Sequence, residues 1–418
     1  MTTFDQISIF DIGKTPLKID KPIRLIELFA GIGSQAKALE RLGADFEHYR
    51  VCEFDKYAIK SYNAIHGTDF ATSDITQITA SDLGIVDTDK YCYIMTYSFP
   101  CQDLSLAGLQ KGMAKGGNTR SGLLWEVERL LNECEELPQI LLMENVTQVH
   151  GTKNLEHFRD WIEFLESKGY SNYWQDLNAK NYGIPQNRNR TFMVSVLGDY
   201  TYEFPKPIPL ELRLKDMLEG HVEEKYYLSD KLLNFFVRHT EKHKAKGNGF
   251  AFKPTNGDVV ARAVTTKAGI RVDDNYIEEP FVKQIGNLFE SKSRENPNQG
   301  RLYDKDGLSP TLGAMQGGNR QPFIVDEPLA YDEQNGYIRK DGTVGTLTTD
   351  GSSPKHNNRV IEDMRIRKLT PKECWRLMGF DDNDFDKAAQ HNSNAQLYKQ
   401  AGNSIVVDVL VAIFKNMF

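Results

Sequence analysis

The chain has 418 residues, of which 40% are hydrophobic and 26% are charged, a composition typical of a globular protein with about two or three domains. Its net charge of −7 at pH 7 excludes a uniformly basic nucleic-acid-binding protein, so contact with a polyanion requires a local basic surface. Because no segment approaches the roughly 18 apolar residues of a membrane span and the first residues do not resemble a secretory signal, we expect a cytoplasmic protein that does not contact a membrane.

The first 200 residues alternate short apolar runs with amphipathic helical patterns. The apolar runs, each predicted to form a strand, are residues 23–29, 48–54, 91–98 and 139–146. The helical patterns, with apolar residues three and four positions apart, are residues 34–43, 55–67, 121–137 and 155–169. This alternation predicts an α/β fold with a doubly wound, mostly parallel sheet and helices on both faces.

The following part of the chain changes character. From about Phe204 to about Arg359 it is rich in turns and poor in periodicity. Residues 258–269, 306–318 and 341–351 each place a threonine-containing, strand-like core between turns, and each predicts a β-hairpin. We therefore expect a smaller, irregular, β-rich domain here.

The helical period returns near the end of the chain, where residues 404–418 predict a helix that completes the first domain. The β-rich domain is then an insertion. The expected segments are an N-terminal extension at 1–21, a catalytic and cofactor-binding domain at 22–200 completed by 363–418, and an inserted domain at 201–362.

Residues 25–34, "LIELFAGIGS", form an apolar strand that runs through a glycine-containing turn into a helix. Such a turn lets backbone N–H groups approach a cofactor closely. Glu53 follows Gly33 by twenty residues, at a position where a carboxylate accepts both hydroxyls of a ribose. The turn does not complete the G-x-G-x-x-G pattern, because Ser34 follows Gly33 and no third glycine comes at the required position. A cofactor with a pyrophosphate is therefore less favoured. The pattern alone leaves a nicotinamide cofactor, S-adenosylmethionine and a simple tight turn open.

Cys101 follows Pro100 at the carboxyl end of a predicted strand, the edge at which open α/β sheets carry their sites. It is one of five cysteines, which lack metal-binding or disulfide spacing and are expected to be reduced thiols. An arbitrary cysteine is more often a buried small hydrophobic residue, but the polar, glycine-rich segment after Cys101 favours an accessible thiol. A nucleophilic thiol must ionise, which a neighbouring cation promotes.

Arg188 and Arg190 alternate at the start of a predicted strand, so their guanidinium groups are expected on one side. They supply the cation for Cys101, or they are simply exposed residues of an edge strand. Glu144 ends the apolar run 139–146 at the same sheet edge. It either anchors a loop or, in a partly desolvated pocket that raises its pKa, holds a proton for a ring nitrogen.

A thiol, a proton-sharing carboxyl group and two arginines beside an adenosyl site fit one reaction. Carbon 5 of cytosine is too weak a nucleophile to attack a methyl sulfonium. Addition of a thiolate to carbon 6, with protonation of ring nitrogen 3, creates an enamine whose carbon 5 can attack. Loss of the carbon 5 proton and of the thiol then restores the aromatic ring.

Five motifs, "FAGIGS", "PCQDLS", "ENV", "QNRNR" and "QLYKQAGNS", resemble those of the DNA (cytosine-5) methyltransferase family in order and approximate spacing. The resemblance implies that Cys101 is the nucleophile, that Glu144 is its proton partner, and that Arg190 contacts the base carbonyl with support from Arg188. It also implies S-adenosyl-L-methionine as the cofactor, S-adenosyl-L-homocysteine as the product, and no metal. The positions that match the family's cofactor site are Phe29, Gly31, Ile32, Gly33, Glu53, Phe54, Asp74, Ile75, Pro100, Leu124, Asn403 and Ser404.

The partner implied by this resemblance is double-stranded DNA, read at a specific short sequence. Residues 301–312 resemble part of the family's target-recognition domain, which places Arg301, Thr311 and Leu312 near DNA, and Gln299 resembles a residue that fills the space left by a flipped base. The implied protein is a monomeric restriction-modification, orphan or phage methylase, with any cognate endonuclease acting separately. The alternatives are a tRNA cytosine-5 methyltransferase, an NAD-dependent oxidoreductase and a non-catalytic DNA-binding protein. The basic character of residues 237–253 favours duplex DNA.

Overall fold

The computed structural model describes the chain in several ranges, namely residues 13–100, 104, 112–115, 120–244, 251–280, 284–287, 301–304, 323–325, 330–332, 337–339 and 364–418. Cys101, Gln299, Thr311 and Leu312 lie outside these residues, and of Arg301 only the backbone is described. The chain divides into two compact units. The first unit draws on Met1–Val222, Phe236–Asn275 and Lys368–Phe418, and the second on Glu223–Phe235 and Tyr276–Arg367.

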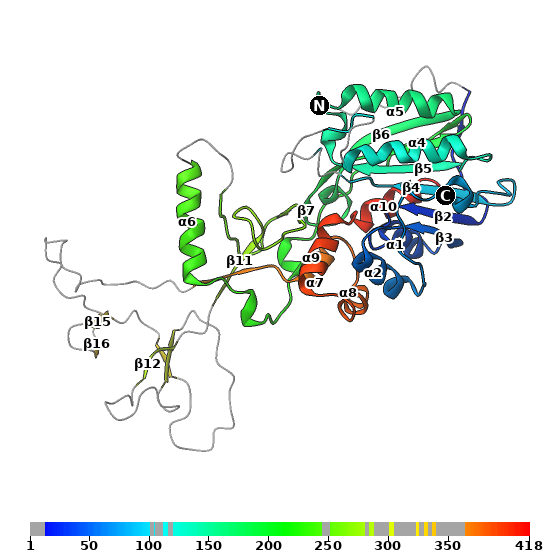
Figure 1. The fold of residues 1–418 in the computed structure, drawn as a ribbon. Coiled ribbons are helices and arrows are strands. Elements are labelled where there is room, and N and C mark those ends of the chain that lie inside the picture. Colours follow the sequence, from blue (N-terminus) through cyan, green and yellow to red (C-terminus); the bar gives the residue numbers. More distant parts are fainter. Residues whose placement is uncertain are drawn as a thin grey trace. The chain divides into compact units, whose positions relative to one another are not determined.

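A six-stranded sheet in the order β3-β2-β4-β5-β8-β6 forms the centre of the first unit (Figure 1). Its strands are β2 (Ile23–Leu28), β3 (Phe46–Cys52), β4 (Cys92–Tyr97), β5 (Ile140–Asn145), β6 (Tyr170–Asn178) and β8 (Asn189–Leu197). The neighbours β3, β2, β4 and β5 are parallel, whereas β8 runs antiparallel to both β5 and β6. The predicted α/β fold with a mostly parallel sheet is thus confirmed.

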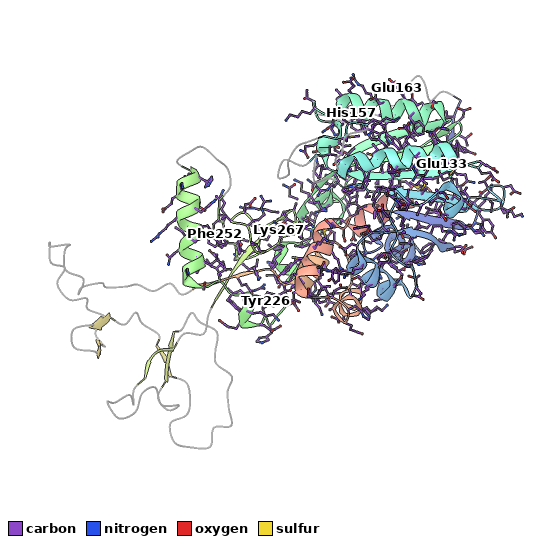
Figure 2. All side chains as sticks on the ribbon, in the orientation of Figure 1. Glu133, His157, Glu163, Tyr226, Phe252 and Lys267 are labelled. Atoms are coloured by element: carbon purple, nitrogen blue, oxygen red, sulfur yellow. The ribbon has the colours of Figure 1, made fainter. Side chains whose placement is uncertain are left out.

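Helices cover both faces of this sheet, which explains why every residue of β4 and β5 is buried. In Figure 1, α4 and α5 lie on one side and α1 and α10 on the other. The bounds are α1 (Ser34–Leu42), α2 (Lys56–His66), α3 (Ala80–Leu83), α4 (Leu124–Glu133), α5 (Leu155–Ser167), α6 (Asp230–Lys244), α7 (Pro371–Arg376), α8 (Asp382–Ala389), α9 (Asn394–Asn403) and α10 (Val407–Lys415). Figure 2 shows side chains throughout these layers, with Glu133 and Glu163 exposed on α4 and α5.

Residues Asn394–Lys415 are the one helical stretch in the described part of the chain that is long and apolar enough to cross a membrane by length and composition alone. Two observations identify it as core structure. Its most apolar window is 67% buried, and α10 packs against α1 within the first unit. The stretch is also interrupted, since Ser404 caps α9 in an extended conformation before α10 begins at Val407.

The remaining strands are short. They are β1 (Thr15–Pro16), β7 (Gln186–Asn187), β9 (Tyr200–Thr201), β10 (Ala261–Arg262), β11 (Tyr276–Pro280), β12 (Gln284–Asn287), β13 (Arg301–Asp304), β14 (Phe323–Val325), β15 (Ala330–Asp332), β16 (Tyr337–Arg339) and β17 (Met364–Lys368). In the second unit β11 pairs with β17, β12, β13 and β14 form one small sheet, and β15 pairs with β16.

The hairpin predicted at residues 258–269 is wrong. The strand β10 within it is two residues long and pairs in parallel with β7, so that Ala261 lies opposite Gln186. The residues expected to form its turn lead into a loop instead. In this loop the side chain of Asn275 accepts from the N–H of Arg262 and donates to the carbonyl of Arg262. The hairpins predicted at 306–318 and 341–351 lie outside the described residues.

Candidate active site

A cavity of about 1020 Å³ opens in the first unit where the strands of the sheet end. Its walls come from the residues that follow β2, β3 and β4, from the end of β5, from the start of β8, and from α9 and the residues just after it. Polar atoms from several elements therefore converge on one hollow at the carboxyl edge of a parallel sheet, which is where ligands bind in open α/β folds.

The turn after β2 forms one side of the cavity and has an unusual backbone. Phe29 has φ 58, a left-handed conformation that a non-glycine residue rarely adopts. The N–H of Gly31 donates to Oε2 of Glu53 at 2.8 Å, and the N–H of Asp55 donates to Oε1 of Glu53 at 2.7 Å. The carboxylate of Glu53 thus joins the ends of β2 and β3, and burial raises its pKa.

Gly33 is the residue at the end of this turn, immediately before α1. Its φ of 81 is left-handed, and a Cβ atom there would overlap the rings of His66 and Tyr62. Only glycine therefore fits where the chain enters α1. Gly33 does not line the cavity, and neither does Leu124, which is fully buried in the core while the neighbouring Leu123 lines the cavity. All the other predicted cofactor residues line it.

Residues of α9 close the cavity from the C-terminal end of the chain. Nζ of Lys399 lies 2.7 Å from Oδ2 of Asp55, the residue that caps α2. Gln400 donates to the carbonyl of Tyr57 at 2.9 Å and accepts from the hydroxyl of Ser61 at 3.0 Å. These contacts hold α9 against α2 and bring Asn403 and Ser404 into the cavity wall.

Glu144 and Arg190 form an ion pair on the opposite side of the cavity. Oε1 of Glu144 lies 3.2 Å from Nε of Arg190. The Glu144 side chain is nearly buried, and this burial raises its pKa, an effect that Arg190 and Arg188 partly offset. The site thus offers a carboxyl group that keeps its proton to a higher pH than an exposed glutamate, next to a fixed positive charge.

Both arginines line the cavity, but they have different partners. The guanidinium of Arg188 donates to the carbonyl oxygens of Val264 at 3.0 Å, Gly402 at 3.0 Å and Ser404 at 2.9 Å. That of Arg190 donates to the carbonyl of Asn189 and pairs with Glu144. Arg188 therefore holds distant parts of the chain together, whereas Arg190 is the arginine paired with the catalytic carboxyl candidate.

Several positioning residues were not anticipated from the sequence. Asn145 donates to the carbonyl of Phe99 at 2.9 Å, and the hydroxyl of Ser121 donates to the carbonyl of Pro100 at 2.7 Å. These bonds fix the backbone immediately before Cys101. Gln186 bonds the carbonyl of Leu377 and the N–H of Val264. A signal existed for Asn145, because an amide at the end of a fully buried strand must find hydrogen-bond partners.

The four cysteines that the structure describes are free thiols with raised pKa values, the consequence of burial in each case. The pKa is raised to about 12 for Cys92 and to about 11 for Cys134. It is also raised for Cys52 and Cys374. A buried thiol with a raised pKa is a poor nucleophile, so none of these four is suited to the predicted chemistry.

Residues 23–418 match the family model of the C-5 cytosine-specific DNA methylases. The chain belongs to this family. The methylase is 30% identical to the type II methyltransferase M2.ScrFI of Lactococcus lactis subsp. cremoris, over 95% of this chain and 99% of that protein. It is 29% identical to the orphan methyltransferase M.SPBetaI of Bacillus phage SPbeta, over 94% of this chain and 97% of that protein. It is therefore a DNA (cytosine-5) methyltransferase of the restriction-modification or orphan type.

Solved structures share the fold of this methylase at lower identity. The Dnmt2 methyltransferase of S. pombe superimposes with a TM-score of 0.59 at 18% identity, covering 94% of this chain and 97% of that chain. The methyltransferase EhMeth of Entamoeba histolytica gives a TM-score of 0.61 at 16% identity, covering 96% and 98%. The family and this fold support S-adenosylmethionine as the methyl donor.

Proposed function

We propose that this methyltransferase modifies carbon 5 of one cytosine within a specific short sequence of double-stranded DNA. The observation that carries the proposal is the Glu144–Arg190 pair, 3.2 Å apart and in the same cavity as the turn after β2. Glu144 can share a proton with ring nitrogen 3 of cytosine, while Arg190 can donate to the adjacent carbonyl oxygen. Cytosine carries this carbonyl next to a nitrogen 3 that has no hydrogen of its own and can therefore take up a proton.

The cofactor side of the cavity fits S-adenosyl-L-methionine, which supplies an electrophilic methyl group when bound. Glu53 uses its two carboxylate oxygens on the backbone but retains lone pairs for ribose hydroxyl groups. Phe54 is 77% exposed at the cavity wall and offers a flat apolar face on which an adenine can stack. We assign the predicted cofactor residues to this ligand, with Gly33 acting through the backbone and Leu124 through packing behind Leu123.

Cys101 is the proposed nucleophile. Its thiolate bonds to carbon 6 of the cytosine while Glu144 shares a proton with nitrogen 3, and the carbon 5 electron pair then takes up the methyl group. Removal of the carbon 5 proton expels the thiolate and restores the ring. Support comes from Pro100, which lines the cavity one residue before Cys101, and from the unsuitability of the four described cysteines.

Arg188 is a proposed positioning residue. Its three bonds to backbone carbonyls use most of the donors of a guanidinium group. It therefore supports the cavity wall, and its positive charge stabilises negative charge there. Arg190, by contrast, contacts the base.

Residues 201–362 are proposed as the target-recognition domain, between catalytic segments 22–200 and 363–418. Within it, Gln299, Arg301, Thr311 and Leu312 are the proposed DNA contacts. Exposed cations on α6, namely Arg238, Lys242 and Lys244, are suited to phosphate contacts. Because carbon 5 of a stacked cytosine cannot enter a cavity, the base must be flipped out, at an unstacking cost of a few kcal/mol. We further propose a cytoplasmic monomer, with any cognate endonuclease acting separately.

Methylation of a plasmid by the purified protein, followed by base-resolution mapping of 5-methylcytosine, tests this function. We expect the mark at one short recurring sequence, and we expect Cys101→Ala to abolish methylation while DNA binding persists. Transfer RNA serves as the competing substrate. Methylation of transfer RNA alone, or full turnover by Cys101→Ala, would overturn the substrate or the nucleophile respectively.

A further inference from the structure

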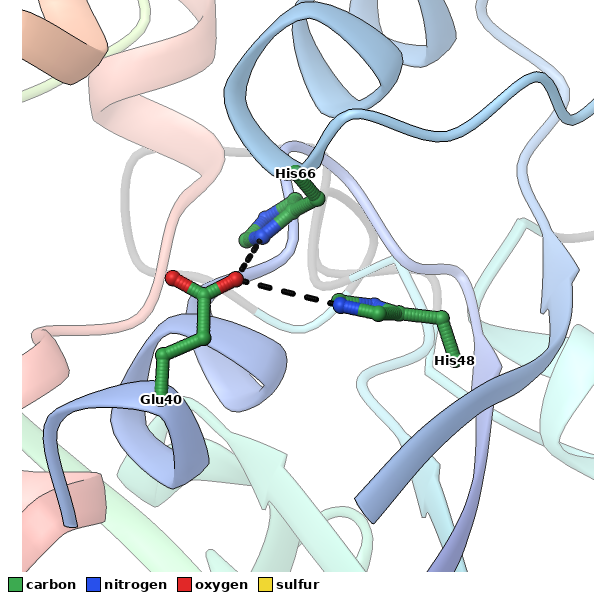
Figure 3. Close-up of side chains that lie close together, drawn as sticks. All are labelled: Glu40, His48 and His66. Carbon is green, nitrogen blue, oxygen red and sulfur yellow. Dashed lines mark hydrogen bonds and ion pairs between the residues drawn. The ribbon is translucent and has the colours of Figure 1, made fainter. Parts of the chain in front are cut away.

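Three side chains outside the cavity converge on one point, as Figure 3 shows. They are Glu40 on α1, His48 on β3 and His66 on α2. Oε1 of Glu40 lies 2.6 Å from Nδ1 of His66 and 3.8 Å from Nε2 of His48, and one ligand atom from each residue lies within 4.8 Å of the others. Since three separate elements supply these residues, the tertiary fold itself brings the cluster together.

The outer nitrogen of each imidazole has its own partner. Nε2 of His66 lies 3.2 Å from the carbonyl oxygen of Ile32, which can only accept, so this nitrogen carries a hydrogen. Nδ1 of His48 lies 3.0 Å from the hydroxyl of Tyr62, and Tyr62 donates its own hydrogen to Oε2 of Glu27 at 2.5 Å. The hydroxyl oxygen of Tyr62 is therefore left to accept from Nδ1 of His48.

These outer bonds determine which nitrogens remain as ligands. With hydrogens on Nε2 of His66 and Nδ1 of His48, the lone pairs of Nδ1 of His66 and Nε2 of His48 are directed toward Glu40. Histidines that bind metals nearly always show this arrangement, in which the second ring N–H donates to a carbonyl or another polar group. An ordinary histidine–glutamate ion pair does not require the second histidine or its hydrogen-bonded tyrosine.

Access and charge also suit a cation. The side chain of His66 is fully sheltered, whereas those of His48 and Glu40 are 19% and 32% exposed, so an ion can enter from the Glu40 side. The neighbouring cation Lys37 lies 3.5 Å from Oε2 of Glu40, the other carboxylate oxygen, and lies closer to Asp384 at 2.9 Å. Oε1 of Glu40 therefore remains oriented toward the two imidazoles.

We propose that Glu40, His48 and His66 bind a divalent transition-metal ion of the zinc type. The ligand atoms are Oε1, Nε2 and Nδ1, with water at a fourth position. The ion takes the place of the proton between His66 and Glu40, and that proton leaves to solvent. Tetrahedral bonds of about 2.0–2.2 Å place ligand atoms about 3.4 Å apart. The oxygen of Glu40 lies 2.6 and 3.8 Å from the two ring nitrogens, and all three ligand atoms lie within 4.8 Å of one another, so side-chain rotations that move these atoms by about 1 Å complete the site.

The proposed ion is structural rather than catalytic, because none of its three ligands lines the cavity. It joins α1, β3 and α2, and two imidazoles with one carboxylate favour Zn²⁺ or Co²⁺ over Mg²⁺ or Ca²⁺. An ion that binds the folded chain alone raises the stability of the first unit. The site also departs from the expectation, drawn from the sequence, that the protein holds no metal.

The test is titration of the full-length, chelator-treated protein with Co²⁺, followed by visible absorption and by thermal unfolding. We expect one equivalent to bind, with absorption bands typical of four- or five-coordinate Co²⁺ and a rise in melting temperature. Glu40→Gln, which preserves shape, and His48→Gln, which removes the imidazole ligand, should each lose the bands and the melting shift. The matched control is the double variant His239→Gln/His243→Gln on α6, whose stacked rings lie 4.1 Å apart, and it should bind as the unmodified chain does.

Tyr62→Phe separates a built site from adsorption to surface histidines. It leaves all three ligands in place but removes the hydroxyl that accepts from His48, so Co²⁺ affinity should fall about 10- to 100-fold. Absence of stoichiometric binding in the unmodified chain would overturn the proposal. So would binding that Glu40→Gln, a substitution at a partly exposed position that leaves the core intact, does not weaken.

Discussion

The two sides of the cavity are built in different ways. On the cofactor side, Glu53 bonds Gly31, 22 residues away, within one strand–helix–strand segment. On the base side, Arg188 bonds Val264 and Ser404, which are 76 and 216 residues away. Local backbone geometry therefore specifies the part of the cofactor side around Glu53, whereas the α9 wall and the base side exist only once distant parts of the first unit have come together. Substitutions on the two sides should fail in different ways.

The largest expected effect belongs to the base side. Glu144→Gln removes the proton that we assign to cytosine nitrogen 3, so kcat should fall by about 10² to 10⁴. The affinity for S-adenosylhomocysteine should stay unchanged, since the amide replaces the carboxyl group at the same volume. Single-turnover methylation and calorimetric binding measure the two quantities. The control is Glu135→Gln, at an exposed position. A loss of cofactor affinity in Glu144→Gln would contradict the assignment of Glu144 to the base side alone.

The pH dependence of kcat tests the assignment of Glu144 as the proton partner of the cytosine ring. Burial raises the pKa of Glu144, so this carboxyl group loses its proton at a higher pH than an ordinary glutamate. A reaction that needs the protonated form must slow as the pH rises through that raised pKa. We therefore expect kcat of the unmodified enzyme to decline on the alkaline side. The decline should vanish in Glu144→Gln, and its persistence would assign it to another group.

A smaller effect is expected from the packing that assembles the base side. A Cβ on Gly402 would overlap the backbone of Thr265 and Thr266, so Gly402→Ala must push these segments apart. The loss should be about 1–3 kcal/mol in the free energy of unfolding, together with a lower kcat because Arg188 loses its carbonyl partner. Urea denaturation measures the first. Gly220→Ala, where a Cβ meets nothing within 4 Å, should be near neutral, and equal effects would refute the packing argument.

The smallest effect concerns the cofactor side. Glu53→Gln replaces an acceptor of two backbone N–H groups with an amide that can accept on one oxygen only. Affinity for S-adenosylhomocysteine should fall about tenfold, which is about 1.4 kcal/mol, while kcat at saturating cofactor changes little. Glu47→Gln, on β3 shortly before Glu53 and paired with Arg24 at an exposed position, is the calorimetric control. A fall in kcat without a fall in cofactor affinity would contradict the assignment of Glu53 to the cofactor site.

Much of the fold followed from periodicity. The predicted strands agree with β2, β3, β4 and β5 to within two residues at each end. For β2, β4 and β5 the reason is that buried parallel strands are nearly continuous apolar runs, whereas β3 is an outer strand in which only Cys52 is buried. The strand β6 was missed because it is an outer strand with few buried residues and its polar sequence resembles a loop. The hairpin at 258–269 failed because its strand pairs with β7, far away in the chain, and local turn signals do not encode such a partner.

The residues of the site divide in the same way, into those that local sequence patterns could place and those that depend on distant partners. Glu53 could be placed from its spacing to Gly33, since both lie in one local unit. Glu144 could be placed at the edge of the sheet, but the 3.2 Å contact with Arg190 depends on the antiparallel pairing of β5 with β8, which the sequence did not indicate. The three carbonyl partners of Arg188 were not predictable, because they come from loops whose positions depend on the whole first unit.

The helix α10, near the end of the chain, packs against α1, near its beginning. A ribosome releases α1 well before α10, so during translation α1 and one face of the central sheet lack the apolar cover that α10 provides. The growing polypeptide must wait, exposed to aggregation and to chaperones, until residues 407–415 emerge. We therefore expect a nonsense mutation ahead of Val407 to leave this apolar face of the first unit uncovered.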